Sequence, residues 1–563
     1  MAALRTLHQA FDEAAATASG YWFTSHDTEQ WTTYRALRNG SLQLARSLRD
    51  AGVRRGDIVA LLLPEAEQFL VALFGTSYSG ATPASLAPPA TTVGLPHYLE
   101  RTVAILRKAD ARAVMTTRRI AAELVAVLAA ARPAFVHQPM VLIVDDLDSQ
   151  ATEPDFAPSP DDVALVQFTS GSTASPKGVT LTHANLAANI EAFGGPQGLA
   201  ISGDDIGVSW LPLSHDMGLV GMALGALYAA RPCVLMPPQE FVKRPAAWLR
   251  AITRHRATVS FAPNFGYELC ARRIADPADL DLSSWRVAGC GAEPIHAATL
   301  AAFAEKFSPA GFRDGAFVPC YGLAEHVLAA TVSPRERRPR IERVSAAALS
   351  EGTARPADGG ERSVALVGCG RPLTGHRLRI VGDGARPLEE RMVGEIELSG
   401  PSVMRGYHHE PELTAETIRD GWLRTGDLGF LSQDELFVCG RAKDVIIVHG
   451  RKFHSEDLEW AVERVGGVRP GRAVAFGSAR EGAERLVVVV ERDGTVEAAV
   501  VADAIRRDIA DVFGLAIDDV VVGDSGTISR TTSGKVQRSA TRAMYENGAL
   551  GGITSASNET SRR

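Results

Sequence analysis

Short apolar runs alternate with helical patterns through the first 300 residues of the chain. One run spans Ile58 to Leu63, Pro64 ends it, and a helical pattern follows over residues 65–74. An apolar run of this length before a helix is typical of a buried parallel strand with its crossover helix. The alternation therefore predicts an α/β fold with mostly parallel sheets covered by helices.

The pattern changes twice further along the chain. After about Gly370, short strands with polar alternation and turn pairs indicate an antiparallel or barrel-like unit. Beyond Gly440, strands such as residues 444–448 alternate with helices such as residues 456–465, as in a small α+β domain. We expect a large region over residues 1–439, a hinge at 440–443, a small C-terminal domain over 444–550 and a disordered tail over 551–563.

Composition excludes several classes of protein. The 563 residues are 45% hydrophobic and 22% charged, and a net charge of −7 without a basic run argues against a nucleic-acid partner. The six cysteines form no CxxC pair and have no adjacent histidine at metal-ligand spacing, which predicts buried reduced thiols. The longest apolar run, residues 219–230, has about half the length of a membrane span, and charged residues interrupt the amino-terminal stretch where a signal peptide is apolar. We therefore expect a cytoplasmic protein with no membrane span.

The segment VALVQFTSGSTASPKG carries the strongest chemical signal. An apolar strand over residues 163–168 runs into a loop of small and hydroxyl residues that a lysine closes. Hydroxyls, free backbone amides and one lysine offer a polyphosphate many donors at once, although the spacing is not that of a Walker loop. A flexible surface turn is the alternative on composition alone. The candidate phosphate-binding residues are Thr169, Ser170, Gly171, Ser172, Thr173 and Lys177.

This segment, SGSTASPKG, resembles the SG[ST]TGxPKG signature of the adenylate-forming (ANL) superfamily of acyl-CoA synthetases, peptide-synthetase adenylation domains and luciferases. Ala174 stands where a glycine is usual, so the loop must bend differently if that glycine has a positive φ. Further motifs follow in the family's order: GAEP at 291–294, YGLAE at 321–325, TGD at 425–427, GRAKD at 440–444 and SRTTSGKVQR at 529–538. The resemblance implies ATP and Mg²⁺ as cofactors. It also implies a large region of doubly wound αβαβα subdomains with a distorted β-barrel, and a mobile α+β C-terminal domain.

The resemblance implies a role for each motif. Tyr321 would stack on adenine, and Glu325, with Thr169, would hold Mg²⁺, because an aromatic face suits a purine and hard oxygens suit Mg²⁺. Asp427 would accept both ribose hydroxyls, with Arg441 close to the ribose. Without the other motifs, Tyr321 would be interpreted as an ordinary core aromatic. The remaining nucleotide-binding residues would be Gly291, Ala292, Glu293, Pro294 and Gly322.

Two lysines belong to the C-terminal motifs. Lys535 would act as a catalytic residue, because a substrate carboxylate and the α-phosphate of ATP repel each other until a cation lies between them. Ser529 replaces the usual proline of this motif, so we expect a less rigid loop. Lys443 takes the hinge position, and rotation about it would withdraw Lys535 and present the opposite face of the small domain to the acceptor thiol.

The acyl site is expected where SWLPLSHDMGLVGMAL and FAPNFGYELC occur, because both segments look most like the fatty acyl-AMP ligase branch. His215 would lie beside the reacting acid, although an isolated HxMG is more often a capped helix start. No charged residue precedes Glu268 in the second segment, so nothing there would bind the α-amino group of an amino acid. A medium- or long-chain fatty acid is therefore favoured. The expected acyl-pocket residues are Met217, Phe261, Asn264 and Phe265.

The acceptor depends on residues 333–363, which composition alone classifies as a long loop. In fatty acyl-AMP ligases an insertion at this location packs on the large domain and restrains the rotation that would build a coenzyme A site. GCGRP at 368–372 also resembles that branch's SCGRP. The resemblance therefore implies acyl-AMP formation followed by transfer to the phosphopantetheine arm of an acyl carrier protein of a polyketide, nonribosomal peptide or lipid pathway.

Two alternatives stay open. A long-chain acyl-CoA synthetase would share the fold and the first half-reaction. A non-catalytic homologue would lack Lys535, Glu325 or Asp427, and all three are present. We expect a monomer or weak homodimer. An acidic carrier protein would need a basic docking patch, and the arginines from Arg335 to Arg343 are its candidates.

Overall fold

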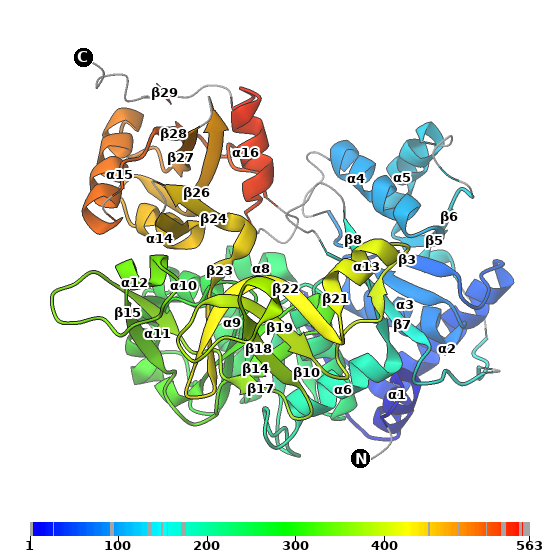
Figure 1. Ribbon diagram of the computed structural model, residues 1–563. Helices are drawn as coiled ribbons and strands as arrows, with labels where there is room; N and C mark the ends of the chain where they lie inside the picture. The colour runs from blue at the N-terminus through cyan, green and yellow to red at the C-terminus, as the bar shows by residue number, and fades with distance from the viewer. Residues whose placement is uncertain are drawn as a thin grey trace.

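The computed structural model arranges the chain in two large sheets, a smaller antiparallel sheet and a separate C-terminal unit (Figure 1). Among the residues it describes, no helix combines the length and the apolar character needed to cross a membrane. The described residues are 4–25, 28–89, 95–131, 135, 137–147, 150–154, 156–169, 176–448, 451–480, 483–513, 515–530, 536–550 and 554–555.

The first large sheet is buried on both faces. Its seven strands follow the order β20 (Gly406–Tyr407), β8 (Lys177–Thr182), β7 (Val163–Thr169), β4 (Thr82–Ser85), β3 (Ile58–Leu62), β5 (Ala111–Thr116) and β6 (Met140–Ile143). Its helices are α2 (Tyr34–Asp50), α3 (Ala66–Tyr78), α4 (Leu95–Lys108) and α5 (Arg118–Ala130). In β3, Val59 and Leu61 join the core that includes α2 and α3, whereas Ala60 and Leu62 join the core that includes α4 and α5. The unbroken apolar run of this strand is thereby explained.

The second large sheet has nine strands and is mostly parallel. Their order is β17 (Arg371–Pro372), β14 (Ala329–Val332), β13 (Phe317–Gly322), β12 (Val287–Cys290), β11 (Val259–Ala262), β9 (Gly207–Ser209), β10 (Cys233–Leu235), β1 (Gly20–Ser25) and β2 (Thr28–Thr33). The helices α8 (Pro238–Lys243), α9 (Ala246–His255), α10 (Asn264–Arg273) and α11 (Ala297–Phe307) follow its central strands in the chain. The rings of Trp248, Tyr267, Trp285 and Phe303 pack together in the core of this half. The two sheets confirm the predicted α/β class.

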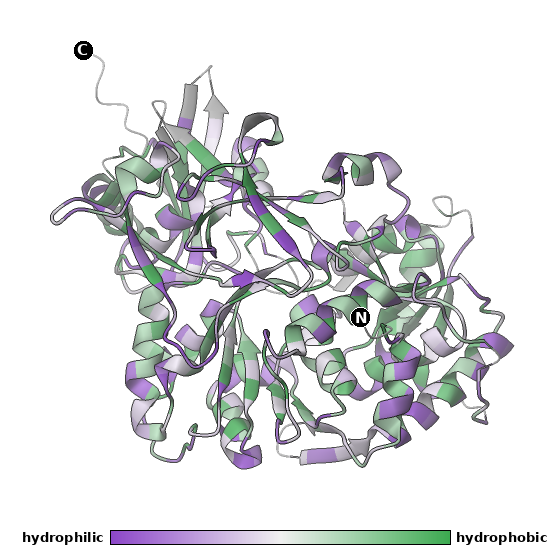
Figure 2. Cartoon of the chain, turned by 60° about the horizontal axis from the view of Figure 1, so that its bottom comes forward, coloured by the Kyte–Doolittle hydropathy of each residue, from purple (hydrophilic) through white to green (hydrophobic). Residues whose placement is uncertain are grey.

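A helical layer lies between the two sheets. It contains α1 (Leu7–Ala15), α6 (His183–Gly194), the π-helical η3 (Met217–Leu224) and α7 (Gly225–Tyr228). Helix α6 contacts β7 and β8 of one sheet and β14 of the other, and η3 contacts β9, β10 and β11. The apolar run at residues 219–230 is therefore the buried η3–α7 helix, which is hydrophobic on every side because no side faces water. In Figure 2 the hydrophobic colour gathers on the strands and on the helix faces turned toward them.

The third sheet carries the segment that composition classified as a loop. Its strands are β18 (Arg377–Val381), β19 (Gly394–Ser399), β21 (Ile418–Arg419), β22 (Trp422–Ser432) and β23 (Glu435–Arg441), with α13 (Pro411–Thr417) beside β21. Residues 333–363 are not a long loop, because they form β15 (Ile341–Ser345) and α12 (Ala346–Ser350), and β15 pairs with β16 (Ser363–Val367). Val344 and Leu349 are buried against Phe430 and Phe437 of β22 and β23. A few apolar residues at buried positions are enough to fold this segment. Its overall composition, rich in arginine, glycine and proline, does not reveal them.

The C-terminal unit has a hydrophobic core of its own (orange and red in Figure 1). It contains β24 (Val445–Val448), β25 (Arg451–His454), α14 (Ser455–Glu463), β26 (Val468–Arg480), β27 (Ala483–Arg492), α15 (Ala498–Phe513), β28 (Asp519–Gly523), α16 (Arg538–Glu546) and β29 (Thr554–Ser555). Its Trp460 stacks on His296 of the large region, with ring centroids 3.7 Å apart. Lys443 lies in the turn η8 (Ala442–Asp444), between β23 and this unit.

One buried side chain joins the helical layer to the second sheet. Asn189 of α6 is fully buried, and its Nδ2 donates to the carbonyl oxygens of His326 (3.1 Å) and Ala329 (2.8 Å). Its Oδ1 accepts from the backbone N–H of Ala329 at 3.2 Å. Asn189 therefore satisfies backbone groups at the start of β14 that have no access to water.

We predict that Asn189→Ala lowers the free energy of unfolding of the large region by about 3 kcal/mol, because buried backbone groups lose their partners. The measurement is a urea titration followed by tryptophan fluorescence. Gln43→Ala is the control, because Gln43 is an exposed amide on α2 and its loss should change the midpoint little. Equal midpoints for the two variants would contradict the bridging role.

Candidate active site

Two side chains from neighbouring parts of the fold bind one buried carboxylate, that of Asp427. The Tyr321 hydroxyl on β13 donates to Asp427 Oδ2 on β22 at 2.8 Å, and Arg441 Nε on β23 lies 3.0 Å from Asp427 Oδ1. Burial, and then the charge of Asp427, raises the pKa of Tyr321 well above its usual range, so the hydroxyl remains a donor. Asp427 raises the pKa of Arg441 in the same way. Each oxygen of Asp427 keeps further lone pairs, so the fixed carboxylate suits a diol.

The GAEP loop lies directly against this cluster. A Cβ at Gly291 would stand 2.9 Å from the Cys320 carbonyl oxygen, so only glycine lets the loop approach β13 this closely. Ala292 has φ +67°, a strained backbone of the kind that occurs at binding sites. Glu293 accepts a hydrogen bond from the Phe265 backbone N–H at 2.6 Å. The loop therefore offers backbone groups rather than free side chains, and Pro294 is exposed.

Glu325 is held by a tyrosine that the sequence motifs do not mark. Tyr407 of β20 donates its hydroxyl to Glu325 Oε1 at 2.8 Å, and Lys177 Nζ lies 5.0 Å from the centre of the Tyr407 ring. Lys177 begins β8, opposite Thr169 at the end of β7. A single oriented carboxylate fits Mg²⁺, which usually takes one or two carboxylates together with substrate phosphates, and the Lys177 ammonium suits those phosphates. The described residues contain no cluster of three or more metal-ligating side chains.

A γ-turn directs Leu328 toward the same region. Val327 has φ +67° and ψ −59°, and the Leu328 N–H donates to the His326 carbonyl oxygen at 2.8 Å. This conformation is strained for a β-branched residue. The turn also brings the Leu328 carbonyl so close to Gly322 that a Cβ there would lie 1.8 Å from the oxygen. Gly322 of the YGLAE motif is therefore required by packing.

A small cavity of about 30 Å³ borders Tyr321. Of the four expected acyl-pocket residues, Met217 and Phe261 line it, and Ala292 and Gly322 lie on its wall as well. Asn264 and Phe265 do not line it. Asn264 Oδ1 instead accepts from the His296 N–H at 3.0 Å, and the Phe265 ring packs on Trp210 and is 38% exposed.

Asp216, which sequence reasoning missed, also lines this cavity. Its Oδ1 caps η3 by accepting from the Met217 N–H at 2.7 Å, and it lies 2.6 Å from His215 Nδ1. The capped helix start that the sequence offered as an alternative is therefore present. His215 contacts Asp216 but is not among the residues that line the cavity.

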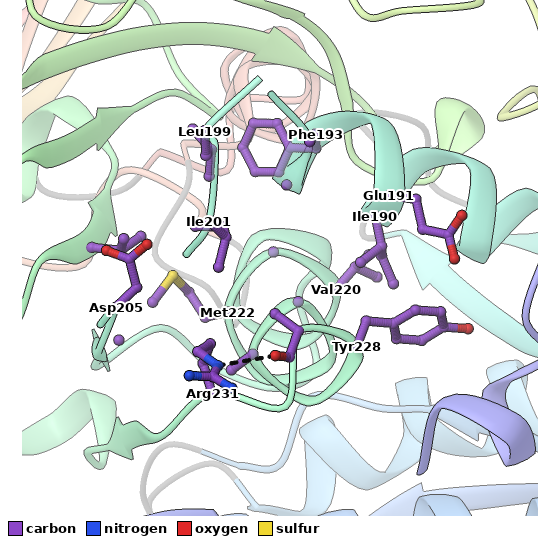
Figure 3. A pocket seen from close by; sticks show the side chains of 18 of the residues that line it. Ile190, Glu191, Phe193, Leu199, Ile201, Asp205, Val220, Met222, Tyr228 and Arg231 are labelled. Carbon is purple, nitrogen blue, oxygen red and sulfur yellow. Dashed lines mark hydrogen bonds between the residues drawn. The ribbon is translucent and has the colours of Figure 1, made fainter. Parts of the chain in front are cut away.

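A larger cavity of about 240 Å³ continues along α6, η3 and α7 (Figure 3). Its lining is mainly apolar and includes Ile190, Leu199 and Met222. Phe193, Gly221 and Leu328 line both cavities, and the Phe193 ring lies 5.6 Å from that of Phe261. The two cavities therefore adjoin at these three residues, which we call the junction, and the apolar lining of the larger one suits an alkyl chain.

Several expected site residues lie outside the described part of the chain. They are Ser170, Gly171, Ser172, Thr173 and Lys535. Hydrogen bonds join the two segments that flank the loop containing Lys535. The Gln537 N–H donates to the Ser529 carbonyl oxygen at 2.8 Å, and Ser529 Oγ donates to Gln537 Oε1 at 2.9 Å. The Ser529 N–H also donates to Thr541 Oγ1 at 3.2 Å, a bond that proline cannot make.

The expected basic patch is smaller than the count of arginines suggests. Arg335 donates to the carbonyl oxygens of Pro196 and Gly198, and Arg340 pairs with Glu342. These two guanidinium groups hold the insertion in place. The exposed arginines of this stretch are Arg337, Arg338 and Arg343.

Known proteins resemble this chain along most of its length. The "Putative acyl-CoA synthetase" of Caulobacter vibrioides is 37% identical over 562 residues, which cover 97% of this chain and 96% of that protein. JamA of Moorena producens, named a medium-chain-fatty-acid acyl-carrier-protein ligase, is 36% identical over 544 residues, covering 92% and 90%. A structure from a study of fatty acyl-adenylate ligases of E. coli and L. pneumophila has a TM-score of 0.90 at 34% identity, covering 97% and 99%.

The family described as AMP-binding enzyme matches residues 10–408. With a family match over more than half of the chain, and with relatives that cover nearly all of it, this protein belongs to the AMP-binding enzyme family, and its resemblance to the fatty acyl-AMP ligases is confirmed.

Proposed function

We propose that this protein is a ligase that converts a medium- or long-chain fatty acid and ATP into acyl-AMP and pyrophosphate, and then transfers the acyl group to the phosphopantetheine thiol of an acyl carrier protein. One observation carries the proposal. The apolar cavity along α6 meets the cavity beside Tyr321 at Phe193, Gly221 and Leu328. An alkyl chain in the first cavity would place its carboxylate in the second, next to the proposed nucleotide site.

The nucleotide would be held by groups that the fold already orients. Tyr321 would stack on adenine, Asp427 would accept the ribose hydroxyls, and Arg441 would stabilise the charge of that carboxylate. Glu325 would hold Mg²⁺, which neutralises phosphate charge when bound. Tyr407 would act as a positioning residue, because its hydroxyl fixes the Glu325 carboxylate.

In the first half-reaction a carboxylate oxygen of the fatty acid would attack the α-phosphorus of ATP. The bond from the α-phosphorus to the bridging oxygen breaks, and pyrophosphate leaves. Lys535 would stabilise the negative charge that gathers between the two anions, and Lys177 would contact the phosphates from the other loop. Apolar walls exclude water from the mixed anhydride, since Met217 and Phe261 are buried beside Tyr321.

In the second half-reaction the thiol would lose its proton and the sulfur would attack the acyl carbonyl carbon. The bond between that carbon and the phosphate oxygen would break, and AMP would leave with the oxygen. The restraint that favours a carrier protein over coenzyme A would come from the insertion. Helix α12 of the insertion contacts β25 of the C-terminal unit, while Val344 and Leu349 are buried against β22 and β23. The insertion thus touches both sides of the proposed hinge at Lys443.

The reaction would take place in the cytoplasm. All six cysteines are free thiols, and five of them are buried. Free thiols suit a reducing compartment that also supplies ATP.

The decisive experiment is a panel of fatty acids incubated with ATP and Mg²⁺ and analysed by mass spectrometry. Phenylalanine is included because the Asp216 carboxylate lines the cavity, and a carboxylate is the kind of group that binds the α-amino group of an amino acid. We expect acyl-AMP from fatty acids only, and acyl transfer when a phosphopantetheinylated carrier protein is added. Efficient acyl-CoA formation would instead assign the coenzyme A alternative, and phenylalanyl-AMP would contradict the fatty-acid assignment.

Lys535→Ala should slow acyl-AMP formation by about a hundredfold to a thousandfold while ATP affinity stays the same, because the charge acts in the transition state. Fatty-acid-dependent pyrophosphate release measures the rate, and calorimetry measures ATP affinity. Lys243→Ala, at an exposed lysine of α8, is the control. Unchanged pyrophosphate release in Lys535→Ala would refute this role.

Gly221→Val should close the junction between the two cavities, because a Cβ at Gly221 already stands 3.0 Å from Leu328 Cδ2. We expect kcat/KM for dodecanoate to fall about a hundredfold. ATP affinity should not change. Gly359→Val is the control, because a Cβ at Gly359 meets no atom within 4 Å. Full activity of Gly221→Val on dodecanoate would show that the acyl chain does not pass this point.

A further inference from the structure

An ion pair made by the N-terminal segment forms part of the lining of the larger cavity. Arg5 Nε lies 3.0 Å from Glu191 Oε1 of α6, and Arg5 Nη1 donates to the Tyr228 carbonyl oxygen of α7 at 3.2 Å. The Arg5 guanidinium also lies 5.4 Å from the centre of the Tyr228 ring. All three residues line the cavity. Three separate segments of the chain are thus tied together by one side chain, and we call Arg5, Glu191 and Tyr228 the clasp.

The clasp lies at a partly exposed part of the cavity lining. The side chains of Arg5 and Glu191 are each 32% exposed, whereas Val220 and Leu199 of the cavity wall are buried. Figure 3 shows Glu191 and Tyr228 together on one side of the cavity. The junction at Phe193, Gly221 and Leu328 leads toward Tyr321, so the clasp and the junction are different parts of the lining. An acyl chain with its carboxylate near Tyr321 that passes the junction and fills the larger cavity would place its methyl end next to the clasp.

The other polar edge of the cavity is anchored differently. Asp205 pairs with Arg286, which lies outside the cavity lining, and Arg231 Nε donates to the Ala229 carbonyl oxygen at 3.1 Å. Among the described lining residues, Arg5 and Glu191 are the two that pair with each other. Half-exposed ion pairs add little to stability. The clasp is therefore a contact that can be broken without unfolding the layer around it.

We propose that the clasp sets the upper limit of acyl-chain length and makes medium-chain fatty acids the substrates of this enzyme, a proposal that rests on the function given above. A chain too long for the cavity must separate Arg5 from Glu191. Arg5 then keeps Glu13 as a partner, but methylene groups lie against a Glu191 carboxylate that has lost its cation. A cavity of about 240 Å³ is also smaller than most ligand pockets. Chains that end inside the cavity avoid this cost.

The test is a chain-length profile of acyl-AMP formation, from hexanoate to octadecanoate, for the wild type and matched variants. The wild type should be most active on medium chains. Arg5→Ala and Glu191→Gln should each raise kcat/KM for hexadecanoate relative to dodecanoate by about tenfold. Gly225→Leu should shift the profile the other way, because Gly225 lines the cavity and a Cβ there meets only the Val220 carbonyl oxygen, at 3.4 Å.

Arg38→Ala is the matched control. Arg38 Nε also anchors α1, through Asp12 Oδ1 at 2.6 Å, but Arg38 does not line the cavity. Its profile should equal that of the wild type. An equal shift in Arg38→Ala and Arg5→Ala would mean that loosening α1 is enough, and would overturn the clasp.

Three further outcomes distinguish a failure of the clasp from a failure of the proposed function. Acyl-AMP formation with identical profiles in the wild type, Arg5→Ala and Glu191→Gln would overturn the clasp and leave the proposed function standing. A wild type equally active on octadecanoate and dodecanoate would do the same. No acyl-AMP from any acid in the panel would overturn both.

Discussion

The helical layer shared by the two large sheets is the constraint on which the rest of the structure depends. The η3–α7 helix is apolar on all sides, so it can be buried only between two apolar surfaces. Once it is there, β11, β12 and β13 end at the edge where η3 begins, and their carboxyl ends carry Phe261, Gly291 and Tyr321. Ligands of α/β proteins bind beyond the carboxyl ends of such strands. The cavity at Tyr321 and the apolar cavity along α6 are neighbours for this reason.

Much of the fold and the order of the motifs could be predicted from the sequence, because both depend on local patterns. The apolar run that contains β3 and the strand before the phosphate loop needed only hydrophobicity and flanking residues to be recognised. Asp427 and Tyr321, which are 106 positions apart in the chain, were assigned to one site by resemblance alone. Their contact depends on the third sheet packing beside the second, and no local pattern encodes that.

Where the described residues lie differs from the sequence-based expectation mainly in side-chain direction. Asn264 and Phe265 begin α10, where neighbouring residues point about 100° apart, so a segment of suitable composition need not face the cavity. The Asn264 amide oxygen instead accepts from the His296 N–H, two residues after the GAEP motif. Tyr407 was missed because its hydroxyl reaches Glu325 from a two-residue strand with no motif of its own. Of the arginines proposed for carrier docking, Arg335 and Arg340 instead bind backbone carbonyls and Glu342.

Strand β23 connects the proposed ribose site to the proposed hinge. Arg441 is the last residue of β23 and pairs with Asp427, and Lys443 follows two positions later in η8. A nucleotide that binds to the existing Asp427–Arg441 pair would therefore also contact the strand that leads into the C-terminal unit. After AMP leaves, the Asp427 carboxylate keeps Tyr321 and Arg441 as partners, so the strand need not rearrange while the unit turns. Because β22 and β23 also bury Val344 and Leu349, the insertion acts on this same strand pair. The restraint on rotation and the recognition of the nucleotide would then be two properties of one structural element.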